Sequence, residues 1–588
     1  MCGVFGYVGE QVDLGSDLLR GLRTLEYRGY DSWGVALGRG RGIDVVKRVG
    51  RVHGDGGEFA PAEIGFGHTR WATHGGVTDA NAHPHLDCAG HLAVIHNGII
   101  DNHRDLRSGL IRRGHRFRSE TDSEVVAHLM EEALLDGGDL GAALAAVFAR
   151  LGGLNAVVVM DARTREMAAV KRVSPLVAGV GPSGAFIASD ALALRPHADR
   201  AVYLEDGQLL RMTRQGLALF DAATLHPLPL RWAELDCSVA EAALGAYPHF
   251  MIKEIAEQPA VIERLVERGR AEIEALAEAI AEARATALVG CGTAANAALT
   301  GRYLFARIAG VRLDTVVGAE FAAHAPFVAS GDLVIALSQS GETADLIEAA
   351  LIARAGGARL AAIVNVKRST LDRMVDLRLH LGAGPEQCVL ATKSYTAKVA
   401  ALLLAAHAAA GDYARGAGLV RTAAEGLREM LREERVAPVR EAAARIRDAG
   451  HMFVIGRGLA YPSALEAALK IKEVSYIHAE GFASGELKHG VIALIEPGTP
   501  CLIYAPNDET RADVLSGAME LKSRGGFTIG VGPEPDPLFD IHLPTPDVGD
   551  AAPIVNALPA QLLGYHVAML RGHDPDRPRN LAKSVTVK

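Results

Sequence analysis

The chain has 588 residues, of which 49% are hydrophobic and 22% are charged, and its formal net charge is -9. Because one domain holds roughly 150 residues, this length predicts about three or four domains in a globular enzyme. The acidic balance argues against a general nucleic-acid or membrane partner. The sequence shows neither a signal peptide nor an uncharged run of about 18 apolar residues, so we expect no membrane span and a cytoplasmic location.

Cysteine and histidine usage predicts reduced thiols and no metal. The 22 histidines lack a ligand pattern such as H-E-x-x-H. The cysteines are scattered along the chain without paired spacing, which is typical of free thiols. We therefore expect neither a metal nor a cofactor. The cysteines are Cys2, Cys88, Cys237, Cys291, Cys388 and Cys501.

The chain opens with Met1-Cys2-Gly3. If the initiator methionine is removed, Cys2 presents a thiol and a free α-amine on the same residue. The amine has a pKa of about 8, so near neutral pH it can take the thiol proton, as in N-terminal threonine nucleophiles. Most cysteines beside an initiator methionine have no catalytic role, so this hypothesis depends on the rest of the chain.

The first part of the chain predicts a mixed α/β domain with packed sheets over residues 2–236. Short β-rich runs are separated there by Gly, Asp and Asn turns. The following stretch, 237–249, has little periodicity and reads as a linker. The clearest predicted elements are strands over 93–96, 156–160 and 186–188 and a helix over 123–135.

Three polar segments of this domain describe a site for an amino acid. The segment His68-Thr69-Arg70-Trp71-Ala72-Thr73-His74-Gly75 joins an arginine, which suits a carboxylate, to an indole. In His96-Asn97-Gly98 an amide lies beside a glycine N–H, the groups that form an oxyanion hole. Asp122 offers a carboxylate for an ammonium group. Together with Cys2, these residues fit hydrolysis of the glutamine amide.

From Phe250 onward, alanine-rich helices alternate with short buried strands, the pattern of doubly wound parallel sheets. A strand followed by a Gly-x-Gly turn ends at Gly292 and again at Gly458, an offset of 166 residues. A later glycine pair begins at Gly356 and again at Gly525, an offset of 169 residues. The near-equal offsets predict a duplicated domain over 250–430 and 431–575. The alternative is chance similarity between two alanine-rich βα units.

In the first copy, the predicted strand ending at Leu337 runs into Ser338-Gln339-Ser340-Gly341-Glu342-Thr343 and then a helix. Hydroxyl groups and free N–H groups at a helix N-terminus attract a phosphate dianion. The alternative is ordinary capping of the helix by Ser or Thr. The equivalent turn of the second copy, 505–510, carries two acids instead, so we expect one copy to bind phosphate. The Gly-x-Gly turns lack the third glycine of a dinucleotide site.

A further cluster consists of Glu466, Lys470 and Glu473, whose spacing places all three on one helix face. Such a cluster combines acid, base and ammonium groups. The alternative is a surface ion-pair ladder, but the flanking alanines, leucines and isoleucine leave little polar surface for a solvated helix. His489 follows in Gly485-Glu486-Leu487-Lys488-His489-Gly490, a loop in which a histidine is available for acid–base chemistry.

These segments resemble the isomerizing glutamine:fructose-6-phosphate amidotransferases, the glucosamine-6-phosphate synthase family. The resemblance implies an N-terminal-nucleophile glutaminase domain, an αββα sandwich, followed by two SIS domains, which makes the chain a multidomain α/β protein. It also implies a homodimer that acts on L-glutamine and fructose 6-phosphate, with a catalytic C-terminal tail over 576–588. The markers are Met1-Cys2-Gly3, 25–32, 68–75, 96–98, 338–343, 475–490 and 578–587.

Carried onto matching positions, the resemblance makes Cys2 the nucleophile that forms a glutamyl thioester, with its own amine as base. Asn97 and Gly98 would stabilise the oxyanion. Arg70 would bind the α-carboxylate of glutamine and Asp122 its α-amine. Trp71 would gate the passage of ammonia. Two further residues of the glutamine site would be Thr73 and His74.

For the sugar site, the resemblance assigns the Schiff base with the open-chain ketose to Lys583. Glu473 would move a proton between C1 and C2, with Lys470 and Glu466 completing the site. His489, supplied by the neighbouring subunit, would assist ring opening. The residues that would bind the phosphate and the sugar are Ser338, Gln339, Ser340, Thr343, Thr293 and Val389.

Two departures from the family pattern lie in the sugar site. Ala294 follows Cys291-Gly292-Thr293 where the family has serine, and Ala391 precedes Thr392-Lys393 where it also has serine. Loss of two hydroxyl groups affects binding of fructose 6-phosphate or accommodates another ketose phosphate, since each neutral hydrogen bond contributes roughly 0.5 to 1.5 kcal/mol. Two alternatives therefore stay open: a paralogue that aminates or deaminates another sugar phosphate, and a non-catalytic sugar-phosphate sensor.

Overall fold

The structure is a computed structural model that describes residues 2–40, 42–54, 59–135, 137–235 and 243–586. The chain forms two compact units. The first holds Met1–Glu241 with the short segments Glu342–Ala344 and Ala582–Lys588, and the second holds Ala242–Gly341 and Asp345–Leu581. Residues 237–242 of the predicted linker over 237–249 lie outside the described residues.

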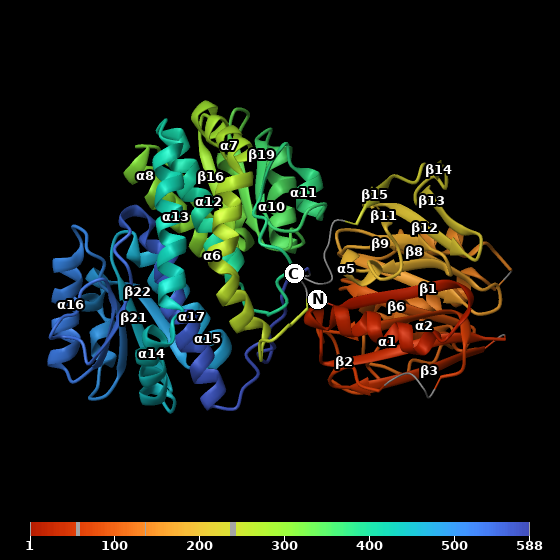
Figure 1. The fold of residues 1–588 in the computed structure, drawn as a ribbon. Coiled ribbons are helices and arrows are strands. Elements are labelled where there is room, and N and C mark those ends of the chain that lie inside the picture. The colour runs from red at the N-terminus through yellow and green to blue at the C-terminus, as the bar shows by residue number, and fades with distance from the viewer. Residues whose placement is uncertain (1, 41, 55–58, 136, 236–242, 587–588) are drawn as a thin grey trace. The chain divides into compact units, whose positions relative to one another are not determined.

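In the described part of the first unit, two antiparallel sheets are present (Figure 1). An eight-stranded sheet has the order β15-β11-β9-β10-β1-β4-β2-β3, and a seven-stranded sheet has the order β14-β13-β12-β8-β7-β6-β5. The strands of the first sheet are β1 (Gly3–Val12), β2 (Ser32–Arg39), β3 (Gly42–Val49), β4 (Ala62–Arg70), β9 (Val177–Gly181), β10 (Gly184–Ala188), β11 (Arg200–Tyr203) and β15 (Trp232–Glu234). Those of the second are β5 (His85–Leu86), β6 (Leu92–Gly98), β7 (Asn155–Asp161), β8 (Glu166–Lys171), β12 (Gln208–Thr213), β13 (Gly216–Asp221) and β14 (Pro227–Leu228).

Alternation along the strands builds four layers. In β1, Val4 and Val8 belong to the core between the two sheets, whereas Phe5 and Tyr7 belong to the core beneath α1. The outer face of the seven-stranded sheet packs against α2, α3 and α4 in a third core. The predicted αββα sandwich is therefore confirmed. The helices of this unit are α1 (Leu14–Leu25), η1 (Glu26–Arg28), α2 (His103–Arg112), α3 (Glu124–Ala133), α4 (Leu140–Phe148) and α5 (Ala191–Leu194).

The second unit contains two parallel five-stranded sheets, with the orders β17-β16-β18-β19-β20 and β22-β21-β23-β24-β25. Both copies therefore place their first strand between the second and the third, as a duplication requires. The first sheet comprises β16 (Thr286–Gly290), β17 (Asp314–Val317), β18 (Leu333–Ser338), β19 (Arg359–Val364) and β20 (Leu377–His380). The second comprises β21 (His451–Gly456), β22 (His478–Ala483), β23 (Pro500–Tyr504), β24 (Phe527–Gly532) and β25 (Ile541–Pro544).

One hydrophobic core joins the two copies, because alanine-rich helices pack between their sheets (Figure 1). The other face of each sheet has a smaller core of its own. The helices between the sheets are α6 (Phe250–Arg268), α7 (Arg270–Glu282), α8 (Thr293–Ile308), α12 (Lys393–Ala409), α13 (Tyr413–Met430), α14 (Glu433–Ile446), α15 (Ala460–Ser475) and α17 (Ala552–Leu570). The remaining ones are η2 (Gly318–Glu320), α9 (Phe321–His324), η3 (Ala325–Phe327), α10 (Ala344–Ala355), α11 (Thr370–Met374), η4 (Ser484–His489), η5 (Val491–Leu494), α16 (Arg511–Ser523) and η6 (Gly549–Ala551).

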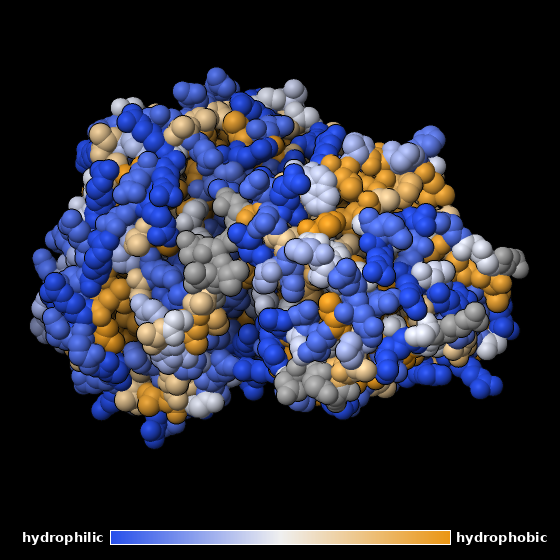
Figure 2. Space-filling model, turned by 45° about the vertical axis from the view of Figure 1, so that its right-hand side comes forward, coloured by the Kyte–Doolittle hydropathy of each residue, from blue (hydrophilic) through white to orange (hydrophobic). Residues whose placement is uncertain are grey.

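Hydrophilic residues cover most of the face shown in Figure 2, and hydrophobic residues gather there in separate patches. Across the described ranges, no helix combines the length and the apolar character needed to cross a bilayer. The cysteines that the structure describes carry free thiols, and Cys237 lies outside those ranges.

An ionic bridge at the end of β20 links three elements of the first copy. His380 Nδ1 lies 3.1 Å from Glu272 Oε1 on α7, and His380 Nε2 lies 2.9 Å from Asp372 Oδ1 on α11. Hydrogen bonds to Asp372 and Glu272 raise the pKa of His380 to about 9. The imidazole is therefore charged at neutral pH and holds two carboxylates together.

We predict that His380→Gln destabilises the chain at low pH more than at high pH. Because folding raises the pKa of His380 from 6.5 to about 9, its stabilisation is complete below pH 6.5 and is lost as the pH rises through about 9. Urea unfolding should show a loss of about 2 kcal/mol at pH 6 and a much smaller loss near pH 10. As a control, His324→Gln removes a ring that packs against Phe321 and Phe327. An equal loss at both pH values for His380→Gln would contradict the ionic bridge.

Candidate active sites

A pocket in the first unit gathers every residue that sequence analysis predicted for glutamine. Further lining residues, which sequence analysis did not predict as site residues, are His83, His96, Thr121, Ser123 and Thr586. His96, Thr121 and Ser123 are neighbours in sequence of predicted site residues, and this proximity could have identified them as lining residues. The predicted residues that line the pocket are Cys2, Arg70, Trp71, Thr73, His74, Asn97, Gly98 and Asp122.

Cys2 immediately precedes β1, and its thiol lies beside the residue that follows β4. The Trp71 N–H donates a hydrogen bond to Cys2 Sγ over 3.2 Å. Asn97 Nδ2 donates to the Cys2 carbonyl over 3.0 Å. Burial raises the pKa of the Cys2 thiol. The thiol is therefore protonated near neutral pH, and a base must remove its proton before it can act as a nucleophile.

A neutral buried histidine orients the Asn97 amide. His68 Nε2 lies 3.0 Å from Asn97 Oδ1 and 3.1 Å from the His96 carbonyl, and 3.1 Å from His83 Nδ1. Burial lowers the pKa of His68 to about 3, so the ring carries a single proton. Since Nε2 faces two oxygen acceptors, the proton belongs on Nε2. This hydrogen bond directs the oxygen of Asn97 toward His68 and its NH2 group toward Cys2.

Gly98 ends β6 in a conformation that favours glycine. Its φ is +140°, and an added Cβ would lie 2.1 Å from the Leu154 carbonyl oxygen. Gly98 pairs with Asn155 on β7, so the backbone has no room to move away. The glycine therefore keeps the strand end beside Asn97 in place.

Arg70 and Asp122 anchor the walls of the pocket. The Arg70 guanidinium donates to the carbonyls of Gly76, over 3.1 Å, Gly75, over 3.3 Å, and His74. Asp122 Oδ2 accepts from the Ile100 N–H over 2.8 Å. A bound amino acid would have to share these groups with the protein, because an arginine has five N–H donors and a carboxylate about four acceptor positions.

In the second unit, α15 carries a buried ionic cluster. Lys470 Nζ lies 2.5 Å from Glu473 Oε2 and 3.7 Å from Glu466 Oε1. The side chains of Lys470 and Glu466 are only 1% and 2% exposed, so the alternative of a surface ion-pair ladder is wrong for them. On the first copy, Thr293 Oγ1 donates to Glu466 Oε1 over 3.1 Å, and Asn296 Nδ2 donates to Glu466 Oε2 over 2.8 Å.

One carboxyl group of this cluster has a pKa near neutral pH. Burial raises the pKa of Glu466 to about 7, although Lys470 and Asn296 oppose the shift. Burial alone would lower the pKa of Lys470, but Glu473 and Glu466 outweigh it and raise this pKa. Lys470 therefore stays charged, while Glu466 exchanges its proton near neutral pH, a property suited to acid–base chemistry.

The predicted phosphate loop follows β18. Ser338 Oγ accepts from the Gly341 N–H over 2.9 Å, and Gly341 has a φ of +68°. An added Cβ at Gly341 would lie 1.9 Å from Ser369 Oγ, so only glycine fits. Gln339 and Ser340 are half-buried in this loop, and Thr343 is half-buried just before α10.

The equivalent loop of the second copy makes different contacts. Asp508 Oδ1 accepts from the Thr510 N–H over 2.9 Å and from Thr510 Oγ1 over 2.6 Å. Glu509 pairs with Arg307 on α8, which also lies 2.6 Å from Asp550 Oδ1. The acids of this copy thus bind Thr510, which precedes α16, and an arginine of the other copy.

Three other predicted residues of the sugar site are Val389, His489 and Lys583. The Val389 N–H donates to the Asp576 carbonyl over 3.0 Å. His489 is exposed in η4, and no hydrogen bond or ion pair within the described ranges joins it to the α15 cluster. Lys583 belongs to the C-terminal segment of the first unit, so its role as the Schiff-base lysine stays a prediction.

Comparisons with known proteins identify the domains. Residues 68–196 match the model of the glutamine amidotransferase domain, and residues 279–408 and 445–571 match that of the SIS domain. Glutamine--fructose-6-phosphate aminotransferase (isomerizing) from Thermus thermophilus is 42% identical to this chain over 612 residues. The alignment covers 100% of both chains. The chain belongs to this family.

Other relatives agree with this membership. The protein of the same name from Pyrococcus horikoshii is 40% identical over 610 residues, with 100% of both chains covered. The solved C-terminal domain of glucosamine-fructose-6-phosphate aminotransferase from Francisella tularensis is 32% identical, with a TM-score of 0.54. That match covers 57% of this chain and 100% of the solved one. The predicted family, enzyme class and fold class are therefore confirmed.

We predict that Lys470→Met lowers the free energy of unfolding by about 3 kcal/mol, because it leaves buried carboxylates without their cation. The double variant Lys470→Met/Glu473→Gln should recover part of this loss, since it removes one of the unpaired charges. Urea unfolding measures both. Lys472→Met, an exposed position on the same helix, is the matched control and should change little. If the double variant loses as much free energy of unfolding as the single variants Lys470→Met and Glu473→Gln lose together, the two side chains do not interact.

Proposed function

We propose that the chain transfers the amide nitrogen of L-glutamine to fructose 6-phosphate, giving glucosamine 6-phosphate and L-glutamate. The observation that carries this proposal is the convergence of Cys2, Arg70, Asn97 and Asp122 on one pocket. Its support from similarity is full-length relatedness to proteins named for this reaction. The buried cluster on α15 supplies the acid–base groups that an isomerisation needs.

In the glutaminase half, removal of Met1 would free the Cys2 amine, which takes the proton of the neutral thiol. The thiolate attacks the side-chain amide carbon of glutamine. The resulting oxyanion receives hydrogen bonds from the second Asn97 Nδ2 hydrogen and the Gly98 N–H. The C–N bond then breaks as the ammonium of Cys2 protonates the leaving nitrogen. Ammonia departs, and water hydrolyses the thioester to glutamate.

Recognition of glutamine depends on charge. We assign its α-carboxylate to the Arg70 guanidinium and its α-ammonium to Asp122, which face the same pocket. Thr73 and His74 complete the binding of the amino acid, and Trp71 gates the passage of ammonia. Both anchors already bind backbone groups, so the pocket is organised before glutamine enters.

In the isomerase half, Ser338, Gln339, Ser340 and Thr343 bind the sugar phosphate through hydroxyl, amide and backbone N–H groups. Thr293 and Val389 bind the sugar itself. Lys583 condenses with the C2 carbonyl and releases water, and ammonia later displaces the lysine. Glu473 removes a proton from C1 and returns it to C2, while the proton of the O1 hydroxyl passes to the nitrogen on C2, so the double bond moves from C2 to a carbonyl at C1. Lys470 and Glu466 support this proton transfer.

His489 completes the site in the proposed homodimer. We assign ring opening of fructose 6-phosphate to His489 of a second copy, because the exposed position of this residue leaves it accessible to a partner. A cytoplasmic location belongs to the same proposal.

We predict that two variants separate the two half-reactions. Cys2→Ala should reduce glutamate release at least a thousandfold, while its fructose 6-phosphate isomerisation persists. Lys583→Ala should abolish sugar chemistry and keep the glutaminase. Release of glutamate and formation of glucosamine 6-phosphate are measured separately, with Cys291→Ala as the cysteine control. Formation of glucosamine 6-phosphate by Lys583→Ala would contradict the proposed role of this lysine. Intact mass of the active protein must also show Met1 removed.

A second candidate function, amination or deamination of another ketose phosphate, is favoured by Ala294 and Ala391. Ala294 is 9% exposed at the start of α8, and Ala391 is half-buried before α12. Each position carries a methyl group where a hydroxyl would otherwise be available to a sugar. The glutaminase half is common to both candidates.

A panel of ketose phosphates with glutamine as donor distinguishes them, and we predict the highest kcat/KM for fructose 6-phosphate. Ala294→Ser and Ala391→Ser should each lower KM for this acceptor by about twofold to tenfold, as expected from one added hydrogen bond. Preference for another ketose phosphate would select the second candidate. Absence of product with every acceptor would support the sensor.

A further inference from the structure

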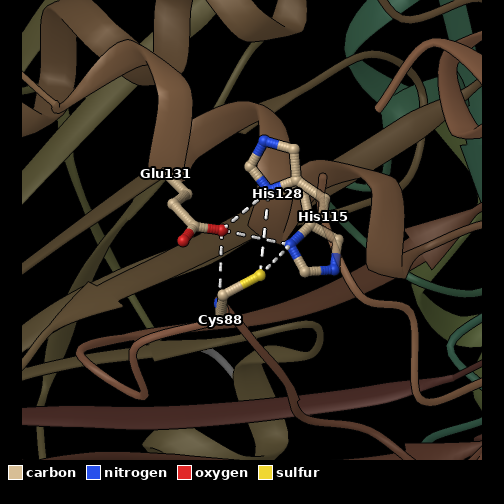
Figure 3. Close-up of side chains that lie close together, drawn as sticks. All are labelled: Cys88, His115, His128 and Glu131. Atoms are coloured by element: carbon tan, nitrogen blue, oxygen red, sulfur yellow. Dashed lines mark hydrogen bonds and ion pairs between the residues drawn. The ribbon is translucent and has the colours of Figure 1, made fainter. Parts of the chain in front are cut away.

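A cluster of metal-ligating side chains lies in the first unit, apart from the glutamine pocket (Figure 3). Cys88 follows the edge strand β5, and His115 follows α2. His128 and Glu131 lie three positions apart on α3, which places them on one face of the helix. The mechanism proposed above uses none of the four.

The donor atoms converge on a common centre. Cys88 Sγ lies 3.8 Å from His115 Nδ1 and 3.6 Å from His128 Nδ1. Glu131 Oε2 lies 3.0 Å from His115 Nδ1 and 3.2 Å from His128 Nδ1. All four atoms lie within 4.8 Å of one another.

These separations match tetrahedral zinc coordination. With bonds of about 2.3 Å to sulfur and about 2.0 to 2.2 Å to nitrogen and oxygen, neighbouring ligand atoms of a tetrahedral site are about 3.3 to 3.6 Å apart. Of the four separations given above, 3.6 Å lies within this range, 3.8 Å lies above it, and 3.0 and 3.2 Å lie below it. A metal ion at the centre would change each of these four separations by only a few tenths of an ångström.

The surroundings orient the ligands as metal sites usually do. His115 Nε2 lies 3.1 Å from Glu132 Oε1, and His128 Nε2 faces Glu124 Oε1 at 3.7 Å. A ligating histidine commonly offers its other ring N–H to a carboxylate, which leaves the first nitrogen free for the metal. The Cys88 N–H also donates to Glu131 Oε2 over 3.2 Å and fixes that carboxylate.

The charge balance also favours a cation. Glu124, Glu131 and Glu132 surround the two imidazoles, and the ion pair of Arg113 offsets Glu132. Glu124 and Glu131 concentrate negative charge beside the imidazoles, and a thiolate would add to this negative charge. A dication compensates this excess at short range.

We propose that Cys88, His115, His128 and Glu131 bind a divalent transition-metal ion, of which zinc fits best. A thiolate with two imidazoles selects zinc over magnesium or calcium, which prefer oxygen ligands. Four protein ligands complete a tetrahedron and leave no open position for substrate, so the ion has a structural role. It would join the loop after β5, the α2–α3 connection and α3 itself.

The place of this site in the fold suggests its consequence. α3 begins at Glu124, directly after Asp122 and Ser123, which line the glutamine pocket. Fixing α3 against the neighbouring loop therefore steadies one wall of that pocket. The ion touches no reacting atom, so its ligands are structural and positioning residues.

Cobalt(II) added to the full-length, chelator-treated protein tests the proposal. We expect one equivalent to bind per chain, with the intense visible absorption of tetrahedral cobalt and a thiolate-to-cobalt charge-transfer band. Zinc should displace the cobalt and raise Tm. In Cys88→Ser the charge-transfer band should disappear, and zinc should bind at least about tenfold more weakly. His115→Ala should lose tetrahedral binding, and both positions lie at or near the surface, where substitution disturbs packing least.

Cys2→Ser and Cys291→Ser are the matched controls and should keep the full cobalt spectrum. A spectrum that persists in Cys88→Ser, or disappears in Cys2→Ser, would place the metal at another thiol and overturn the proposal. Absence of the charge-transfer band in the unaltered protein would overturn it without any variant. The four side chains would then form a Cys–His–Glu hydrogen-bond network alone.

Discussion

The pairing of β1 with β4 is the constraint on which the glutamine pocket depends. Gly3 pairs with Thr69, so Cys2 lies beside the end of β4, which Arg70 completes and Trp71 follows. Side chains alternate along a strand, so a register shift by one residue would exchange the two buried faces of β1. Both faces are apolar and packed, one against the other sheet and one against α1. Packing of the sandwich thereby fixes the position of the candidate nucleophile.

Burial shifts the pKa of ionisable side chains in both units, but the consequence differs between them. In the first, it keeps His68 neutral, and a neutral ring with one proton can orient the Asn97 amide. In the second, it raises the pKa of Glu466 to about 7 while Lys470 stays charged beside Glu473. Low polarity disfavours charge in both places, but only the second provides a partner ion. One core therefore supports a hydrogen-bond framework and the other a proton-exchanging group.

Duplication gave the second unit two equivalent loops, and their contacts have diverged. The loop after β18 keeps hydroxyl groups and a glycine with positive φ. The loop after β23 uses Glu509 to bind Arg307 of the other copy. An acid paired with arginine stabilises the contact between copies, but it also repels a phosphate. The same topology thus serves the proposed anion binding in one copy and the contact between copies in the other.

The sequence by itself determined the fold class, the duplication and the family, because apolar periodicity and the motifs around Cys2, Arg70 and Asn97 are local. It also predicted the buried character of α15 from its alanines and leucines. It missed the role of His68 beside Asn97 and the convergence of Cys88 with His115, since these contacts join separate strands, helices and loops. Which side chains meet depends on strand register and on the packing of α3 against its neighbours, and only the tertiary structure decided those.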